Sequence, residues 1–112
     1  MKKLTLLFIL TIACSQLGVF ADSSYSVQSL PTPAGTVCEV TGLDYSDDGT
    51  LYICTRRGDV WAQKNGDWQR FARGAREPMG LLAGPDFAVV SQRPEVTRLV
   101  DEDGDGTADR YE

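Results

Sequence analysis

The chain of 112 residues contains no histidine. Histidine is the commonest general acid–base group and the usual nitrogen ligand of zinc, so its absence excludes Ser-His-Asp hydrolysis and His-ligated zinc. The three cysteines show no CxxC or CxxCH spacing, which removes dithiol redox chemistry and c-type haem attachment. The eleven basic residues are scattered and the formal net charge is −5, so we expect no nucleic-acid partner. No residue is assigned a catalytic role.

Long hydrophobic runs are absent except at the N-terminus. Two lysines precede the ten-residue apolar run 4–13, which is too short to span a bilayer and is typical of an export signal. A small-residue cleavage pattern predicts a signal peptide over residues 1–21. The alternative is a bacterial lipoprotein site, at which Cys14 would carry a lipid anchor. In both cases we expect export to the periplasm, the envelope or the extracellular space, with no transmembrane segment after signal removal.

Ordinary cleavage would leave only Cys38 and Cys54. In an oxidising compartment an isolated pair is a disulfide candidate, and closing that loop would stabilise the fold by about 3 kcal/mol. The alternative is two buried thiols that behave as small apolar residues. The sequence leaves both possibilities open.

Short apolar runs separated by turn residues begin at Val37, after a polar, proline-punctuated leader over residues 22–36. Runs of four to seven residues with this punctuation are typical of antiparallel strands. Asn65-Gly66 is a strong hairpin signal because both residues tolerate positive φ. We expect strands at 40–46, 51–55, 60–63, 68–71, 80–83, 87–90 and 94–100. The sequence therefore predicts an all-β fold of short antiparallel meanders.

The second half of this pattern repeats the first. Residues 55–60 align with residues 91–96, and the period of roughly 36 to 38 residues is close to the length of a four-stranded propeller blade. The alignment matches the charged residues of two turns, Arg57 with Arg93 and Asp59 with Glu95. We predict two blades of a β-propeller, over residues 37–74 and 75–112. Because a closed propeller needs four or more blades, we expect the chain to be an incomplete propeller and a fragment of a longer protein.

The most specific motif is the acidic segment 101–112, which holds six acidic residues and one basic residue. Its spacing fits the calcium-loop template D-x-D-x-D-G-x5-E at every constrained position, and glycine at the sixth place permits the sharp turn. The expected ligands are five carboxylates and one backbone carbonyl, from Asp101, Asp103, Asp105, Thr107, Asp109 and Glu112. The alternative is a solvated Asp/Gly turn without metal. Strand-like alternation in Pro94–Val100 favours a helix-free calcium loop at a strand end over an EF-hand.

Five stretches also carry a family resemblance: Gly42–Tyr52, Thr55–Trp61, Glu77–Leu81, Gln92–Leu99 and Asp101–Asp109. They resemble bacterial six-bladed β-propellers of the soluble quinoprotein glucose/sorbosone dehydrogenase type, in particular the large secreted group described as membrane-bound dehydrogenases. The first stretch is generic to many propellers. The Thr-Arg-Arg-Gly-Asp-Val-Trp and Gln-Arg-Pro-Glu pieces are more specific.

The resemblance implies a propeller channel that holds pyrroloquinoline quinone, with a histidine base that accepts the proton during hydride transfer from a sugar or polyol. No histidine is available here, so any catalytic residues of such a dehydrogenase lie outside this sequence. Arg57 and Arg93 could meet an anionic ligand in the channel, although pairing with Asp59 and Glu95 is the simpler expectation. The alternatives are a non-enzymatic envelope propeller scaffold and a small calcium-binding module.

Overall fold

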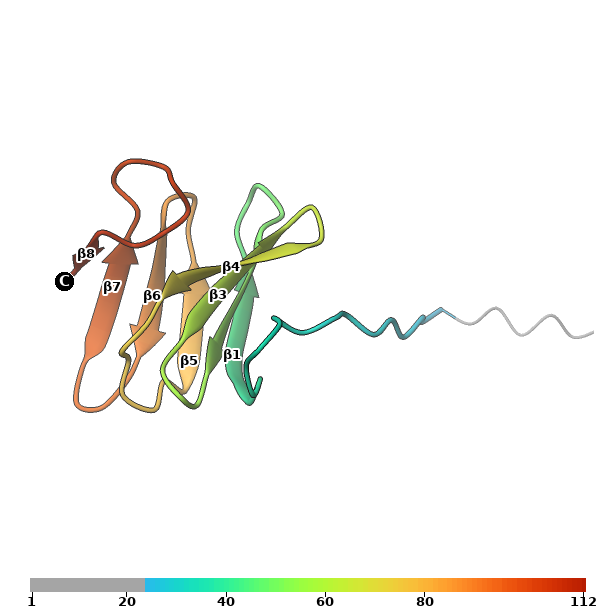
Figure 1. Ribbon diagram of the computed structural model, residues 1–112, viewed down its shortest axis with the longest axis horizontal. Coiled ribbons are helices and arrows are strands. Elements are labelled where there is room, and N and C mark those ends of the chain that lie inside the picture. The colour runs from blue at the N-terminus through green and yellow to red at the C-terminus, as the bar shows by residue number, and fades with distance from the viewer. Residues whose placement is uncertain (1–23) are drawn as a thin grey trace, which may run out of the picture. The chain divides into compact units, whose positions relative to one another are not determined.

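A computed structural model of the protein describes residues 24–112. The predicted signal peptide and the alternative lipid anchor at Cys14 lie outside these residues. Within them, Pro31–Glu112 forms one compact unit that contains every described strand. The strands are β1 (Val40–Tyr45), β2 (Leu51–Thr55), β3 (Val60–Lys64), β4 (Asp67–Ala72), β5 (Gly80–Ala83), β6 (Phe87–Ser91), β7 (Val96–Val100) and β8 (Arg110–Tyr111) (Figure 1). The predicted all-β class is confirmed, and residues 24–112 include no helix that could cross a membrane.

The strands form two four-stranded antiparallel sheets, each in the order of the chain. Sheet 1 contains β1–β4 and sheet 2 contains β5–β8 (Figure 1). The turn between β3 and β4 is the predicted two-residue hairpin, in which Asn65 and Gly66 have φ of 53° and 89°. Strand β8 was not expected from the sequence, because its two residues carry no apolar pattern.

The strand register confirms the internal repeat. Cross-strand partners form rows of side chains on one face of each sheet. The row Gly42–Cys54–Val60 of sheet 1 corresponds to the row Gly80–Ser91–Val96 of sheet 2. The next row, Asp44–Tyr52–Ala62, corresponds to Leu82–Val89–Arg98. The two sheets are therefore built on the same scheme, with a period of about 36 to 38 residues as the sequence predicts.

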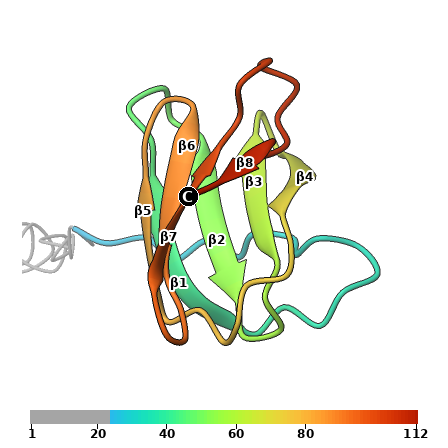
Figure 2. The same ribbon diagram turned by 90° about the vertical axis from the view of Figure 1, so that its left-hand side faces the viewer.

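The core lies between the two sheets, which form separate layers (Figure 2). Sheet 1 and sheet 2 approach each other most closely at β1 and β5, where a Cβ on Gly42 would stand 3.0 Å from the backbone nitrogen of Leu81. The rings of Tyr52 and Phe71 meet edge to face at 5.2 Å between centroids. The buried cluster comprises Tyr52, Cys54, Val60, Phe71, Ala72, Ala88, Val90, Leu99 and Ala108. The loss of water from these side chains supplies most of the force that holds the sheets together.

The compact unit begins inside the segment that the sequence indicates as a leader. Pro33 is fully buried, and the indole Nε1 of Trp68 donates a 2.7 Å hydrogen bond to the carbonyl of Pro31. Residues 31–36 are therefore tied to β4 in sheet 1.

Candidate metal centre

The acidic loop, residues 101–109, connects β7 to β8 at one end of sheet 2 (Figure 1). The backbone fixes both of its ends: Asp101 N–H donates to the Asp86 carbonyl at 2.9 Å, and Asp109 N–H donates to the Val100 carbonyl at 2.8 Å. Gly104 and Gly106 have φ of 78° and 85°, a region that side-chain-bearing residues rarely adopt. The loop thus enters from a strand, as the alternation before it indicates, and leaves into β8, which the sequence did not predict.

Three of the predicted ligands converge. One carboxylate oxygen from each of Asp101, Asp103 and Asp109 lies within 4.8 Å of the other two. Oxygens that share one Ca²⁺ at 2.3–2.6 Å stand at most about 5 Å apart, so this group has the size of a calcium shell. Among the described residues none of the three carboxylates forms an ion pair. Their mutual repulsion is therefore not offset by any lysine or arginine of the described chain.

Backbone amides hold these carboxylates in place. Gly104 and Gly106 N–H groups donate to the two oxygens of Asp101 at 2.7 and 2.8 Å. Asp105 N–H donates to Asp103 Oδ1 at 3.1 Å, and Glu102 N–H donates to Asp109 Oδ2 at 2.8 Å. Each oxygen keeps a further lone pair, so the loop presents oriented carboxylates that suit a hard cation.

The other predicted ligands lie outside this group. Asp105 Oδ1 accepts the Thr107 N–H at 2.8 Å. The Glu112 carboxylate lies 3.2 Å from Arg98 Nη1 and 3.6 Å from Arg110 Nε. Glu112 also exchanges backbone hydrogen bonds with Arg98, which fixes it as a continuation of the β7–β8 pair. Two arginines therefore neutralise the carboxylate of Glu112, which occupies the twelfth position of the calcium-loop template.

Sheet 1 contacts the loop through a residue that sequence reasoning did not single out. Gln69, on β4, donates from Nε2 to the Asp105 carbonyl at 2.9 Å. A Cβ on Gly106 would stand 2.6 Å from Gln69 Oε1, so glycine serves both the turn and this close approach. Nearby, Ala108 N–H donates to the Phe71 carbonyl at 2.7 Å. A lone glutamine in a strand carries no sequence signal for this role.

A cavity of about 340 Å³ adjoins the loop and is lined by residues of both sheets, including Asp48, Asp86, Asp101 and Tyr52. Burial raises the pKa of the Tyr52 phenol, and the charges of Asp48, Asp101 and Asp86 raise it further. The Ser46 hydroxyl holds the pKa of Asp48 well below its usual range, with further hydrogen bonds from the Thr50 backbone and from Lys64. Negative charge therefore extends from the loop into the space between the sheets.

The two matched arginines do not form the expected pairs. Arg93 Nε lies 3.5 Å from the Glu77 carboxylate, and Arg57 forms no ion pair within residues 24–112. Glu95 instead accepts the Thr97 hydroxyl at 2.9 Å. The expectation of Arg57–Asp59 and Arg93–Glu95 pairs is wrong. Glu95 accepts a hydrogen bond from Thr97 instead, and Arg93 pairs with Glu77 of the β4–β5 connection.

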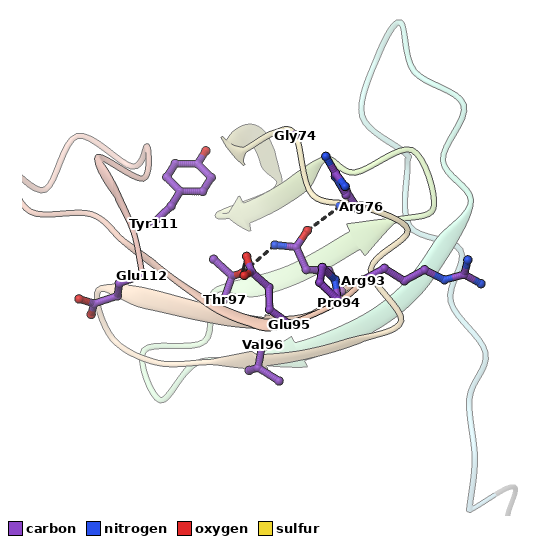
Figure 3. Close-up of a pocket in the computed structure, with 10 residues that line it drawn as sticks. Gly74, Arg76, Arg93, Pro94, Glu95, Val96, Thr97, Tyr111 and Glu112 are labelled. Atoms are coloured by element: carbon purple, nitrogen blue, oxygen red, sulfur yellow. Dashed lines mark hydrogen bonds between the residues drawn. The ribbon is translucent and has the colours of Figure 1, made fainter.

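Arg93 also borders a cavity of about 540 Å³ near the β6–β7 turn, whose lining includes Arg76, Thr97 and Tyr111. Figure 3 shows Arg93 on the opposite side of the cavity from Tyr111, with its guanidinium directed away from the other lining residues. The positive groups do not converge on one point, so the cavity offers no evident anion site.

Cys38 and Cys54 are both free thiols, so the disulfide alternative is not realised. Cys54 is paired across the sheet with Gly42, and Cys38 lies four residues before Gly42, outside β1. The register therefore does not place the two cysteines opposite each other, as a disulfide would need. Cys54 instead fills the core with no exposed surface, as the buried-thiol alternative predicts, whereas Cys38 is partly exposed and does not fit it.

Chemically, the clearest arrangement in the described residues is the group of three carboxylates, whose oxygens are of the type that a hard cation prefers. Comparisons with protein families, curated proteins and solved structures gave no match. The resemblance to quinoprotein dehydrogenases therefore stays a prediction that depends on the quoted motifs. The acidic loop is the feature with the clearest chemistry.

Proposed function

We propose that the acidic loop binds Ca²⁺ through Asp101, Asp103 and Asp109. The observation that supports this proposal is the convergence of three carboxylate oxygens within 4.8 Å, none of them in an ion pair within the described chain. Hard oxygen ligands in an open loop suit Ca²⁺, which accepts variable geometry. Mg²⁺ demands a small octahedral shell and dehydrates reluctantly, so it should compete poorly.

The proposed role of the ion is structural. The loop belongs to sheet 2, but Gln69 and Phe71 of sheet 1 hold it by hydrogen bonds to Asp105 and Ala108. A cation that orders the loop would therefore also stabilise the contact between the sheets, by offsetting the entropy of fixing the loop.

Isothermal titration of Ca²⁺ into the mature chain and three variants tests the site. We expect a dissociation constant of about 10⁻⁴ to 10⁻³ M for the wild type, the range of extracellular modules. Asp103→Asn should weaken binding roughly tenfold, because it removes one charge from the converging group. Asp105→Asn is the matched control in the same loop and should have a smaller effect. Glu102→Gln, whose carboxylate lies 3.2 Å from Arg110 Nε, should have the smallest.

The order of the three losses discriminates the models. Equal losses in all three variants would mean that the loop acts only as diffuse negative charge, and the site would be rejected. Equal losses for Asp103→Asn and Asp105→Asn, with none for Glu102→Gln, would favour the complete template over the three-carboxylate group. No Ca²⁺-dependent heat at millimolar concentration would refute calcium binding altogether.

For the chain as a whole, we infer an exported piece of a glucose/sorbosone dehydrogenase-like β-propeller. Two consecutive four-stranded meanders that pack face to face, with matched rows and the same strand order, support this inference. Any pyrroloquinoline quinone, sugar or polyol site would then depend on residues outside this sequence, since it has no histidine.

The test is dye-linked sugar oxidation by a polypeptide extended along its reading frame, with and without the quinone. Quinone-dependent activity that is lost on replacing a downstream histidine supports the dehydrogenase. Further sheets without such a histidine would favour the non-enzymatic envelope scaffold. A reading frame without further sheets would favour the small calcium-binding module.

A further inference from the structure

The cavity of about 340 Å³ beside the acidic loop contains a buried phenol that has no hydrogen-bond partner. Tyr52, in the middle of β2, is 6% exposed and lines this cavity. Its hydroxyl forms no hydrogen bond with any residue of the described range 24–112. Buried hydroxyls are normally hydrogen-bonded, because removing one from water without a new partner is costly. The position therefore suits a ligand that supplies the missing partner.

The hydroxyl is directed toward the acidic side of the cavity. The charges that raise the pKa of Tyr52 belong to Asp48, Asp101 and Asp86, and all three residues line the same cavity. Because the effect of a charge falls with distance, the phenol oxygen lies at the end of the side chain that faces them. The ring of Tyr52 packs edge to face on Phe71, which also lines the cavity. An apolar wall, one free hydroxyl and several carboxylates thus border the same space.

The charges around the cavity are not balanced. Its lining contains four carboxylates and one ammonium group, from Asp48, Asp86, Asp101, Asp105 and Lys64. The ammonium group is already paired, since Lys64 Nζ lies 3.1 Å from Asp48 Oδ2. The other three carboxylates form no ion pair within residues 24–112. A cationic ligand would offset this excess, whereas an anion would be repelled.

The distribution of these carboxylates favours an organic cation over a second metal ion. A metal ion needs oxygens that share one point, and in the described part of the chain the group that does so is Asp101, Asp103 and Asp109. Asp48 and Asp86 belong to no such group there, so the charges around the cavity are spread out. The volume is at the small end of the range for ligand pockets. A short aliphatic chain with separated ammonium groups fits both observations.

We propose that this cavity binds a small aliphatic diamine, whose ammonium groups donate to the Tyr52 hydroxyl and meet the carboxylates of Asp86 and Asp101. Its methylene chain packs against the Phe71 ring. This binding site goes beyond the proposed calcium site and does not depend on it. Because Asp101 borders both, each cation should weaken the binding of the other by the same factor.

Nuclear magnetic resonance of the mature chain in chelator, titrated with the linear diamine putrescine, tests the proposal. We expect saturable shifts of the Tyr52 and Asp86 amide signals. Tyr52→Phe should raise the dissociation constant roughly fivefold, because it removes the hydrogen-bond acceptor. Asp86→Asn should raise it by a similar factor, because it removes one charge that meets an ammonium group.

Two matched controls make the same chemical changes outside the cavity lining. Tyr45→Phe lies on the opposite face of sheet 1, at a 58% exposed position. Asp47→Asn lies in the β1–β2 turn, at an exposed position. Both should change the dissociation constant by less than about twofold, since solvent and salt screen a distant charge. The matching butanediol, which has no charge, should bind roughly tenfold more weakly than putrescine.

Four results would overturn the proposal. An absence of saturable shifts at high millimolar putrescine would refute binding, and equal affinities for putrescine and butanediol would refute cation recognition. Shifts confined to the Asp103 and Asp109 amides, or equal losses in Asp86→Asn and Asp47→Asn, would assign the binding to diffuse charge of the loop. An unchanged affinity of a folded Tyr52→Phe would remove the phenol from the site. Should that variant lose its fold in urea titration, the exposed Asp86 and its control decide alone.

Calcium separates this proposal from the proposed function. Titration in chelator measures diamine binding whether or not the loop binds Ca²⁺, so a failure of either proposal leaves the other standing. If both are right, saturating Ca²⁺ should raise the dissociation constant of putrescine several-fold, because the ion neutralises Asp101.

Discussion

Sheets 1 and 2 share strand order and register, yet they differ in what covers them. In the row Gly42–Cys54–Val60, which faces sheet 2, Cys54 and Val60 have no exposed surface, whereas Ser91 and Val96 of the equivalent row Gly80–Ser91–Val96 are exposed. Valine ends both rows. The comparison shows that the burial of these two valines depends on whether a neighbouring sheet covers them and not on the residue type. An exposed apolar residue on a sheet face therefore marks a surface that suits a neighbour.

The sheets also differ where their last two strands are joined. Between β3 and β4 lies a two-residue turn, Asn65-Gly66, while the same point of sheet 2 carries the acidic loop, residues 101–109. The strands on either side still pair in antiparallel register. The scaffold is therefore constant and the chemistry is confined to one enlarged connection, a common arrangement in which loops carry function on a rigid frame.

The largest expected difference between the sheets concerns their matched glycines. Gly42→Val should destabilise the monomer by about 3 kcal/mol, because the new side chain has no room against sheet 2. Gly80→Val should change the free energy of unfolding by less than about 0.5 kcal/mol. Urea denaturation in dilute solution measures both. Similar losses at the two positions would break the comparison, since they would show that the close approach at Gly42 does not matter.

The matched valines test the same contrast by removing volume. Val60→Ala should cost about 2 kcal/mol, because it leaves a cavity in the core between the sheets. Val96→Ala should cost much less in the monomer, since its side chain is 67% exposed. Thermal unfolding followed by circular dichroism provides the comparison. A Val96→Ala loss as large as that of Val60→Ala would mean that the outer face of sheet 2 is covered in the monomer.

A third prediction concerns the hydrogen bond by which sheet 1 holds the loop of sheet 2. Gln69→Ala should weaken Ca²⁺ binding a few-fold, because the loop must then be ordered without the bond to Asp105. Gln63→Ala removes a glutamine that bonds only within the β3–β4 hairpin and serves as the control. Calorimetric titration compares the two variants. Identical affinities would show that sheet 1 contributes nothing to the site.

The smallest expected effect concerns pH. The folded state raises the pKa of Tyr52, so its contribution to stability is complete below the unfolded value of about 10 and is lost as pH rises through the folded value. Tyr52→Phe should remove this part of the alkaline loss and change little at neutral pH. Unfolding free energies of both proteins between neutral and strongly alkaline pH measure the difference. Parallel curves would exclude Tyr52 as the titrating group.

Much of the fold was predictable because it depends on local signals. Alternating apolar runs indicate the strands, Asn65-Gly66 indicates the tight hairpin, and the periodic restart indicates two similar sheets. The position of the acidic loop was predictable for the same reason, since its spacing indicated six ligands, of which Asp101, Asp103 and Asp109 converge in the structure. These features need no knowledge of what lies across the molecule.

What the sequence could not predict depends on distant partners. Glu112 fits the calcium template, but Arg98 and Arg110 hold its carboxylate once β8 pairs with β7. The disulfide alternative fails because the register places Cys54 opposite Gly42. Gln69 becomes part of the site only because sheet 1 packs beside the loop. In each case the deciding group is far away in sequence and carries no motif.

The buried thiol of Cys54 has a consequence for how the two sheets can be observed. Burial raises its pKa, which keeps it protonated and unreactive toward oxidants and alkylating reagents. Modification therefore requires that sheet 1 and sheet 2 move apart at β1 and β5. The rate at which a thiol reagent labels Cys54 then measures the free energy of that local opening. Labelling of Cys54 thus reports how often the two sheets separate at β1 and β5, where the two backbones come closest.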